Sequence, residues 1–101
     1  MSEGIVRAKF NAPVDQERVA ADWRQRGYSC HLFVDPPGQQ WNDFVHATNE
    51  LLTVVDGRLA LLLEGERVEV GPGDEVFIRR DARHSVHNVH DQTTRWLFGY
   101  D

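Results

Sequence analysis

The sequence predicts an all-β fold, an antiparallel sandwich or barrel, preceded by one short helix. Three observations predict it. Apolar residues alternate with polar ones along seven or more short segments after residue 27. Turns that contain glycine separate these segments, as they do in antiparallel sandwiches and barrels. The intervals between the segments are too short for the crossover helices that a parallel sheet needs.

The length of 101 residues predicts a single domain, with residues 1–27 as an N-terminal strand and helix arm and residues 28–101 as the barrel. Lys and Arg total 11 and Asp and Glu total 16, so the formal net charge is −5. Nucleic acid needs a cationic surface, and no apolar run approaches the ~20 residues that span a bilayer. We therefore expect neither nucleic acid nor a membrane as a partner.

The start of the chain, Met1 to Gly4, lacks the basic and then apolar order of a secretory signal. Cys30 is the only cysteine, so an internal disulfide cannot form, and a lone thiol is typical of a reducing compartment. We expect a cytoplasmic protein. In it Cys30 is a buried structural thiol on a strand rather than a nucleophile.

Residues 15–27 have the signals of one amphipathic helix. Asp15 is a suitable N-cap and Gly27 a suitable C-terminal stop. Val19, Ala20 and Trp23 fall on one helical face, which favours a helix that packs on the barrel. A partner-binding helix is the alternative, and a scaffold role is the interpretation we favour.

The first strands follow this helix. Residues 28–34 alternate and end at Pro36-Pro37-Gly38, and residues 51–55 are apolar and β-branched. Asp56-Gly57 comes next, a dipeptide typical of two-residue hairpin turns. Leu59, Leu61 and Leu63 then alternate along another strand. These patterns predict three strands and a hairpin between the second and the third.

The remaining strands lie beyond residue 63. A turn at Glu64-Gly65 precedes the alternating Val68 and Val70, and Gly71-Pro72-Gly73-Asp74 forms a tight corner. Strands at residues 76–78, 85–89 and 96–100 complete the predicted set.

Three polar side chains point to a metal site. His46 and Glu50 are four residues apart, so on an extended backbone both project from one face, although a bend at Thr48-Asn49 would weaken that argument. His84 heads a later strand. Two imidazoles and one carboxylate suit a divalent Fe, Mn, Co, Ni or Zn ion. The alternative is a metal-free polar cluster whose members hydrogen-bond one another in an apolar barrel.

The spacing of these residues resembles the two motifs of the cupin superfamily. His46, Glu50 and Gly57 match the second His, the Glu and the closing Gly of the first motif. Gly73, His84 and Asn88 match the Gly, His and Asn of the second. The resemblance covers residues 38–88 and is strongest to small single-domain bacterial members. It implies a double-stranded β-helix, or jelly roll, in which His46, Glu50 and His84 bind the metal.

The chain departs from the cupin pattern at three places. Phe44 occupies the position of the first metal-binding His, and it cannot coordinate a metal. Arg79 and Asp81 replace the Pro and Gly of the second motif. Three ligands still hold a metal and leave more coordination positions open for water or substrate.

Further residues are candidates for the surroundings of the metal. His31 is the first candidate for a fourth ligand, against the more common role of a core or surface histidine. Asn88, Gln40 or Asn42 would hydrogen-bond the second ring nitrogen of a metal-bound His. His87 has the opposite strand parity to His84 and should face away.

Aromatic and cationic residues are candidates for the pocket. Trp41 and Phe44 form either an aromatic wall that favours a flat or apolar ligand, or part of the core. Trp96, Phe98 and Tyr100 make a stripe at strand spacing, expected in the core or at a dimer face. The three arginines at positions 79, 80 and 83 either rim the barrel mouth or lie in a solvated loop.

Two classes of function remain open. The first is a metal-dependent enzyme of the dioxygenase or isomerase type that acts on a small metabolite, with Tyr28, His31 and Asp43 as candidates for proton transfer. The second is a non-catalytic module that binds a small molecule with or without metal. The resemblance also implies a homodimer, formed through residues 96–100 or through a strand at residues 5–10.

Overall fold

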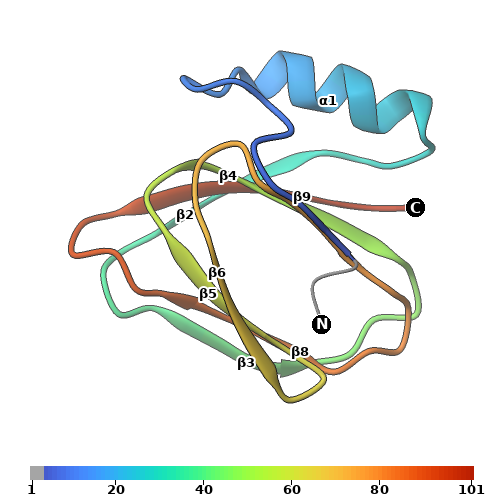
Figure 1. The fold of residues 1–101 in the computed structure, drawn as a ribbon. Helices are drawn as coiled ribbons and strands as arrows, with labels where there is room; N and C mark the ends of the chain where they lie inside the picture. Colours follow the sequence, from blue (N-terminus) through green and yellow to red (C-terminus); the bar gives the residue numbers. More distant parts are fainter. Residues whose placement is uncertain (1–3) are drawn as a thin grey trace.

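The computed structural model describes residues 4–101, so the first three residues of the predicted arm lie outside the described residues. The described chain forms one helix and nine strands, which enclose a barrel with the helix outside it (Figure 1). The helix is α1 (Gln16–Gln25). The strands are β1 (Ile5–Val6), β2 (His31–Asp35), β3 (Gln40–Phe44), β4 (Glu50–Asp56), β5 (Leu59–Leu63), β6 (Glu66–Val70), β7 (Glu75–Ile78), β8 (His84–Asn88) and β9 (Thr94–Tyr100).

The strands form two sheets. One has the order β1-β7-β4-β9-β2 and the other the order β3-β8-β5-β6. Every pair of neighbouring strands is antiparallel. This arrangement confirms the predicted all-β jelly-roll barrel with a short helix. It also leaves β2 and β3 as edge strands on one side and β1 and β6 on the other.

Along β4, the residues of even number face the barrel interior. Leu52 and Val54 pack in the interior core against Leu59 and Leu61 of β5. Residues of odd number, such as Leu51, pack instead in a second core beneath α1. Glu50 has the parity of Leu52 and Val54, so the alternation of the strand directs its carboxylate into the barrel.

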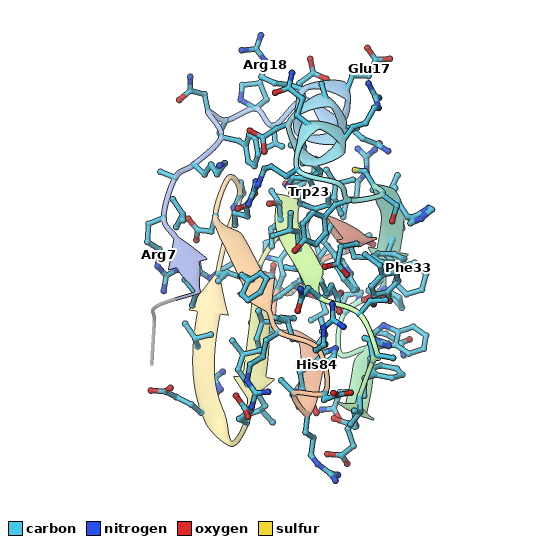
Figure 2. The ribbon with its side chains drawn as sticks, turned by 90° about the vertical axis from the view of Figure 1, so that its right-hand side faces the viewer. Arg7, Glu17, Arg18, Trp23, Phe33 and His84 are labelled. Atoms are coloured by element: carbon cyan, nitrogen blue, oxygen red, sulfur yellow. The ribbon has the colours of Figure 1, made fainter. Side chains whose placement is uncertain are left out.

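The helix begins and ends at the predicted residues. The Asp15 side chain accepts a hydrogen bond of 2.9 Å from the Glu17 backbone N–H, and Gly27 follows the helix at φ +88°. Val19 and Trp23 are fully buried in the second core. Figure 2 shows Trp23 beneath the helix and His84 well below it. The helix therefore covers the outer face of the five-stranded sheet, away from the barrel interior.

The predicted hairpin at Asp56-Gly57 is wrong, because β4 and β5 belong to different sheets. Gly57, at φ +108°, instead carries the chain across from one sheet to the other. A Cβ atom at this position would lie 2.2 Å from the Thr94 hydroxyl oxygen. The two-residue hairpin turn is Glu64-Gly65 between β5 and β6, with φ values of 51° and 87°.

Two expected strands have different boundaries, and one strand was not expected. The strand expected from residue 28 begins at His31, and the strand expected over residues 5–10 is limited to Ile5–Val6. No expected strand covers β3, whose sequence is mostly polar. Its register shifts between Trp41 and Phe44, with Asp43 at φ +60°. This bulge turns Trp41 and Phe44 to the same side although they are three residues apart.

No helix among residues 4–101 is long and apolar enough to cross a membrane.

Candidate metal centre

His46, Glu50 and His84 converge inside the barrel, and we call these three residues the metal group. Their ligand atoms all lie within 4.8 Å of one another. Glu50 Oε1 lies 3.7 Å from His46 Nε2 and 3.3 Å from His84 Nε2. Two imidazoles and one carboxylate thus share a space small enough for a single ion.

Three different elements position the group. Glu50 begins β4 and pairs with Ile78 and Tyr100, and His84 begins β8 opposite Leu63. His46 lies in the bent loop between β3 and β4, so it does not reach Glu50 along an extended backbone. Glu50 and His84 are 4% and 3% exposed, whereas His46 is half-buried. A molecule from solvent therefore reaches the metal group past His46.

A backbone carbonyl sets the tautomer of His84. Its Nδ1 lies 3.0 Å from the Ala82 carbonyl oxygen, which only accepts hydrogen bonds, so Nδ1 carries the proton. In the neutral ring Nε2 then directs a lone pair toward Glu50 Oε1, and the two acceptors face each other at 3.3 Å. A cation between them removes this repulsion. Burial lowers the pKa of His84, but Glu50 and the Ala82 carbonyl outweigh burial and raise the pKa above its ordinary value.

One oxygen of the Glu50 carboxylate lacks a hydrogen-bond donor. Its Oε1 atom is buried and accepts no hydrogen bond from residues 4–101, since the approach of His84 lacks hydrogen-bond geometry. A buried acceptor without a donor costs about 1–3 kcal/mol, and a charged one costs more. An ion held by the two imidazoles would supply the missing partner. The donor set fits a divalent transition metal, and the orphaned oxygen is the observation that supports the fit.

The structure places the other candidate ligands outside the metal group. His31 is exposed on β2, and its ring lies 5.4 Å from the ring of Phe98. His87 faces away from the barrel, as expected, and its Nε2 lies 2.6 Å from Asn42 Oδ1. Gln40 pairs with His87 across β3 and β8. The expected hydrogen bonds from Asn42 or Gln40 to a ligand histidine are absent among the described residues, and Ala82 takes that role.

Asn88 lies at the other end of β8 from His84 and has a structural role. Its amide nitrogen donates to three backbone carbonyls, those of Asp35, Pro36 and Gln92, at 2.9–3.1 Å. Its oxygen accepts from the Thr94 hydroxyl at 2.7 Å and from a backbone N–H. Asn88 therefore fixes the turn after β2 rather than a metal ligand.

Aromatic side chains line a cavity of about 180 Å³ beside the metal group, which we call the aromatic slot. It opens between the edge strands β2 and β3. Its lining consists of Phe33, Trp41, Phe44, His46, Val86, Trp96, Phe98 and Tyr100. The predicted aromatic wall of Trp41 and Phe44 is therefore present. The stripe on β9 also faces this slot, and β9 lies between β4 and β2, so it is not available as a dimer face.

The other expected proton-transfer residues lie apart from the metal group. Tyr28 packs against the core beneath α1, and Asp43 is exposed beside Arg83 at 3.9 Å. Tyr100 is a residue that the sequence analysis assigned only to the stripe. Its ring lies 5.1 Å from that of His46. Burial and the charge of Glu50 raise the pKa of Tyr100, so its phenol stays protonated at neutral pH.

The three arginines near His84 form surface ion pairs instead of a free cationic rim. Arg79 pairs with Glu64, Arg80 with Asp101, and Arg83 with Asp43. All three side chains are more than half exposed, which agrees with the solvated-loop interpretation.

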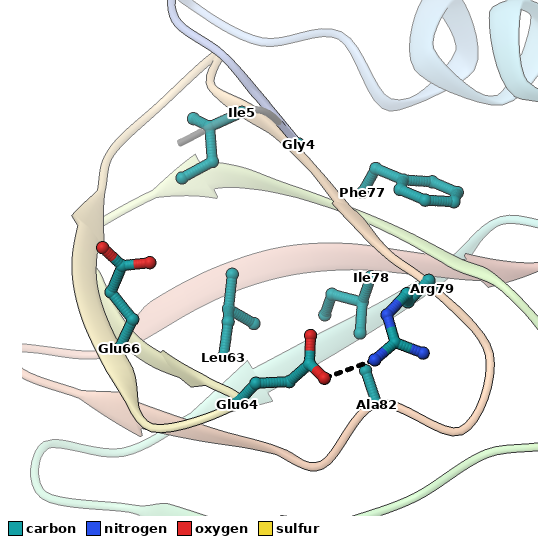
Figure 3. Close-up of a pocket in the computed structure, with 9 residues that line it drawn as sticks. All are labelled: Gly4, Ile5, Leu63, Glu64, Glu66, Phe77, Ile78, Arg79 and Ala82. Atoms are coloured by element: carbon teal, nitrogen blue, oxygen red, sulfur yellow. Dashed lines mark hydrogen bonds and ion pairs between the residues drawn. The ribbon is translucent and has the colours of Figure 1, made fainter. Parts of the chain in front are cut away.

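A second cavity, of about 430 Å³, lies at the opposite edge of the barrel, between the β1–β7 edge and the β5–β6 hairpin. Ile5, Leu63 and Ile78 line it, and the ion pair of Glu64 with Arg79 borders it (Figure 3). It is the larger cavity, but it shares no lining residue with the metal group or the aromatic slot. Volume alone therefore does not locate the candidate centre.

Known structures with this fold agree with the barrel. A cupin 2 domain-containing protein from Halorhodospira halophila is 23% identical, with a TM-score of 0.69 over 77% of this chain and 57% of that one. The polyketide cyclase RemF from Streptomyces resistomycificus is 28% identical, with a TM-score of 0.65 over 72% of this chain and 53% of that one. This chain thus spans less than two thirds of either protein.

A mutant of the salicylate 1,2-dioxygenase from Pseudoaminobacter salicylatoxidans is 15% identical, with a TM-score of 0.66 over 73% of this chain and 21% of that one. A comparison with curated proteins gave no match. The family model of the cupin domain matches residues 31–100, from the start of β2 to the end of β9. Together with the jelly-roll topology, this match shows that the chain belongs to the cupin family.

Proposed function

We propose that this chain is a single-domain metal-dependent cupin, in which His46, Glu50 and His84 hold one divalent metal ion and a small molecule binds beside it. The metal is Fe, Mn, Co, Ni or Zn. One observation carries the proposal: the buried Glu50 Oε1, which has no hydrogen-bond donor among the described residues, lies 3.3 Å from His84 Nε2, the ring nitrogen that the Ala82 carbonyl does not engage. Without metal, a neutral His84 would leave two acceptors facing each other, and protonation of His84, which its raised pKa favours, is what a bound metal would replace.

The function that this geometry supports best is an enzyme of the dioxygenase or isomerase type. A bound divalent metal supplies Lewis-acid chemistry to a substrate oxygen. Three protein ligands leave coordination positions open, and the aromatic slot adjoins His46. Tyr100 provides a protonated phenol at the same wall, so it is the side chain we assign to hold or donate a proton near the substrate.

A binding module without turnover is the second candidate, and one observation favours it. Of the side chains that line the aromatic slot, only His46 and Tyr100 are ionisable. A cavity that is otherwise apolar orients a ligand but offers few groups for acid–base catalysis.

Metal analysis tests the metal site. We expect purified wild-type protein, loaded with Zn²⁺ or with Fe²⁺ under nitrogen, to retain one ion per chain after dialysis. His46→Ala should lose this ion, because it removes a ligand. His87→Ala is the matched control, since His87 lies on the other face of β8 and should change nothing. Sub-stoichiometric metal in the wild-type protein, or equal retention in His46→Ala, would refute the site.

Oxygen consumption then separates the two candidates. Fe²⁺-loaded protein is supplied with a panel of small phenols and enols, and oxygen uptake is followed with an electrode. Oxygen uptake, or isomerisation of one compound without uptake, that depends on the metal and falls in Tyr100→Phe supports the enzyme. Binding of a compound without any turnover supports the module.

We further propose a cytoplasmic homodimer. The lone thiol of Cys30 is half-buried in the core beneath α1, which supports a reducing compartment. Val6 of β1 and Phe77 of β7 are about half exposed on the outer face of the sheet, and they supply the apolar contact. Light scattering should give twice the chain mass, and Phe77→Glu should give the monomer. A wild-type mass equal to one chain at all concentrations would contradict the dimer.

A further inference from the structure

Six aromatic rings form a closed belt around the aromatic slot. In order around the belt they are Trp41, Phe33, Phe98, Tyr100, His46 and Phe44. The centroids of successive rings lie 5.1–6.3 Å apart. β2, β3 and β9 supply five of these rings and the loop before β4 supplies His46, so the belt joins the two sheets where their edges part.

The belt surrounds an opening that exposes aromatic surface. Phe33 and Phe44, on opposite edge strands, are each 37% exposed. Trp96 lies behind the belt, 5.5 Å from the ring of Phe33 and nearly perpendicular to it. A cavity of about 180 Å³ is smaller than the ~300 Å³ at which pockets for drug-sized ligands begin, so its occupant has one or two rings.

A buried carboxylate holds the two indoles in place. Asp35 Oδ2 accepts a hydrogen bond of 3.1 Å from Trp41 Nε1 and one of 2.9 Å from Trp96 Nε1. Asp35 itself is 3% exposed. Because both indole N–H groups are used, neither is free to bond a ligand, and the indoles offer only their ring surfaces. The slot is therefore pre-organised for stacking rather than for hydrogen bonding.

We propose that the aromatic slot binds a planar, uncharged aromatic molecule of one or two rings, with a hydroxyl or carbonyl oxygen on the edge that faces His46. The stacking part of this inference stands on the belt alone. The orientation of the oxygen rests on the proposed function, because His46 is both a ring of the belt and a member of the metal group.

Charge and shape exclude the competing ligands. A quaternary ammonium group suits aromatic faces in general, but once the metal of the proposed function is bound it would lie beside a divalent cation that repels it. A carboxylate stacked among the rings, away from the metal group, would lose its hydration without a cationic side chain there to replace it. A saturated ring system buries similar apolar area but loses the edge-to-face contacts with the belt.

Calorimetric titration of the wild-type protein with 2-naphthol tests the inference. We expect 2-naphthol to bind at least tenfold more tightly than decahydro-2-naphthol, its saturated counterpart, and more tightly than tetramethylammonium. Equal binding of the saturated compound, tighter binding of tetramethylammonium, or no binding of 2-naphthol would overturn the assignment.

Two variants locate the binding. Phe33→Leu and Phe44→Leu keep apolar bulk at half-exposed positions but remove a ring, and each should weaken 2-naphthol binding about tenfold. Phe77→Leu is the control, since Phe77 is 41% exposed outside the slot and should leave binding unchanged. Circular dichroism confirms that each variant is folded. Equal weakening by Phe77→Leu would contradict the location.

The titration is repeated with the Zn²⁺-loaded protein and with metal-free His84→Ala. Tighter binding of 2-naphthol in the loaded protein supports the assigned orientation, and equal binding overturns it. Retained binding in His84→Ala, together with absent metal binding in the wild-type protein, would refute the metal site and leave the slot intact. Metal binding without 2-naphthol binding would refute the slot alone.

Discussion

Glu50 and Glu75 begin neighbouring strands of one sheet, and both are at least 96% buried, yet their surroundings differ completely. Glu75 Oε2 accepts a hydrogen bond of 2.8 Å from Trp23 Nε1, and Arg26 donates to both oxygens at 2.9 Å. In the described part of the chain, Glu50 Oε1 accepts no hydrogen bond and lies beside the imidazoles of His46 and His84. A carboxylate with its donors in place holds the fold together, and the one without them is the carboxylate on which the proposed metal site rests.

The same contrast separates the two ends of β8. At one end Asn88 uses its whole amide group to hold three backbone carbonyls and two donors. At the other end His84 has one nitrogen fixed by Ala82 and the other directed at an acceptor. Two matched residues of one cupin motif therefore have different roles, since Asn88 is structural and His84 belongs to the candidate site.

The largest expected loss of stability is at Glu75, the carboxylate whose hydrogen-bond donors are in place. Glu75→Ala leaves the buried Trp23 indole N–H and the Arg26 guanidinium without their acceptor. We expect it to lower the free energy of unfolding by about 3 kcal/mol, a value below that of a fully buried pair because Arg26 is partly exposed. Urea unfolding measures the change. A loss below about 1 kcal/mol would show that this anchor of α1 contributes little.

A smaller loss of stability is expected at Gly57, which lies against Thr94, a residue whose hydroxyl donates a hydrogen bond to Asn88. Gly57→Ala places a methyl group against the Thr94 hydroxyl and strains a positive φ, so we expect a loss of about 2 kcal/mol. Gly65→Ala is the matched control, because its φ is also positive but no atom lies within 4 Å of the added Cβ. It should cost about 1 kcal/mol. Thermal unfolding of both variants distinguishes the clash with Thr94 from the backbone strain. Equal losses of stability in the two variants would show that the clash adds nothing.

A still smaller effect is expected at Asp74, a carboxylate whose side chain is 14% exposed and whose hydrogen-bond donors are in place. Burial raises its pKa, but the N–H groups of Gly71 and Ala8 and the side chain of Arg7 outweigh burial and lower the pKa. A lowered pKa stabilises the fold above the ordinary Asp pKa of about 3.9, and the contribution is lost as pH falls through the folded value. Asp74→Asn should therefore cost about 1 kcal/mol at pH 7 and progressively less as pH falls below the ordinary Asp pKa. A loss that does not depend on pH would contradict this role.

The sequence predicted the parts of the fold that local patterns encode. The alternation of Leu59, Leu61 and Leu63 and the turn at Glu64-Gly65 are both present. The same reasoning failed at Asp56-Gly57, because dipeptide preferences do not reveal whether the next strand stays in the same sheet. It also missed β3, where a bulge rather than an alternation brings two aromatic rings to one side.

The candidate site was predictable only through its spacing. His46, Glu50 and His84 were found because cupin motifs fix their intervals, whereas an extended backbone between His46 and Glu50 is not what joins them. The belt of aromatic rings had no comparable signal. Its rings come from segments that are remote in the sequence, and only the folded edges of two sheets bring Phe33 and Phe44 around one opening.

The most direct test compares the stability of wild-type protein and Glu50→Gln, each with and without Zn²⁺. Without metal, we expect Glu50→Gln to be at least as stable as the wild-type protein, since it removes a buried charge whose Oε1 atom has no donor among the described residues. With Zn²⁺ at 100 times its dissociation constant, the wild-type protein should gain about 2.7 kcal/mol and Glu50→Gln almost nothing. If Glu50→Gln instead loses as much stability without metal as Glu75→Ala, and Zn²⁺ stabilises both proteins equally, then Glu50 is a structural residue and the account is wrong.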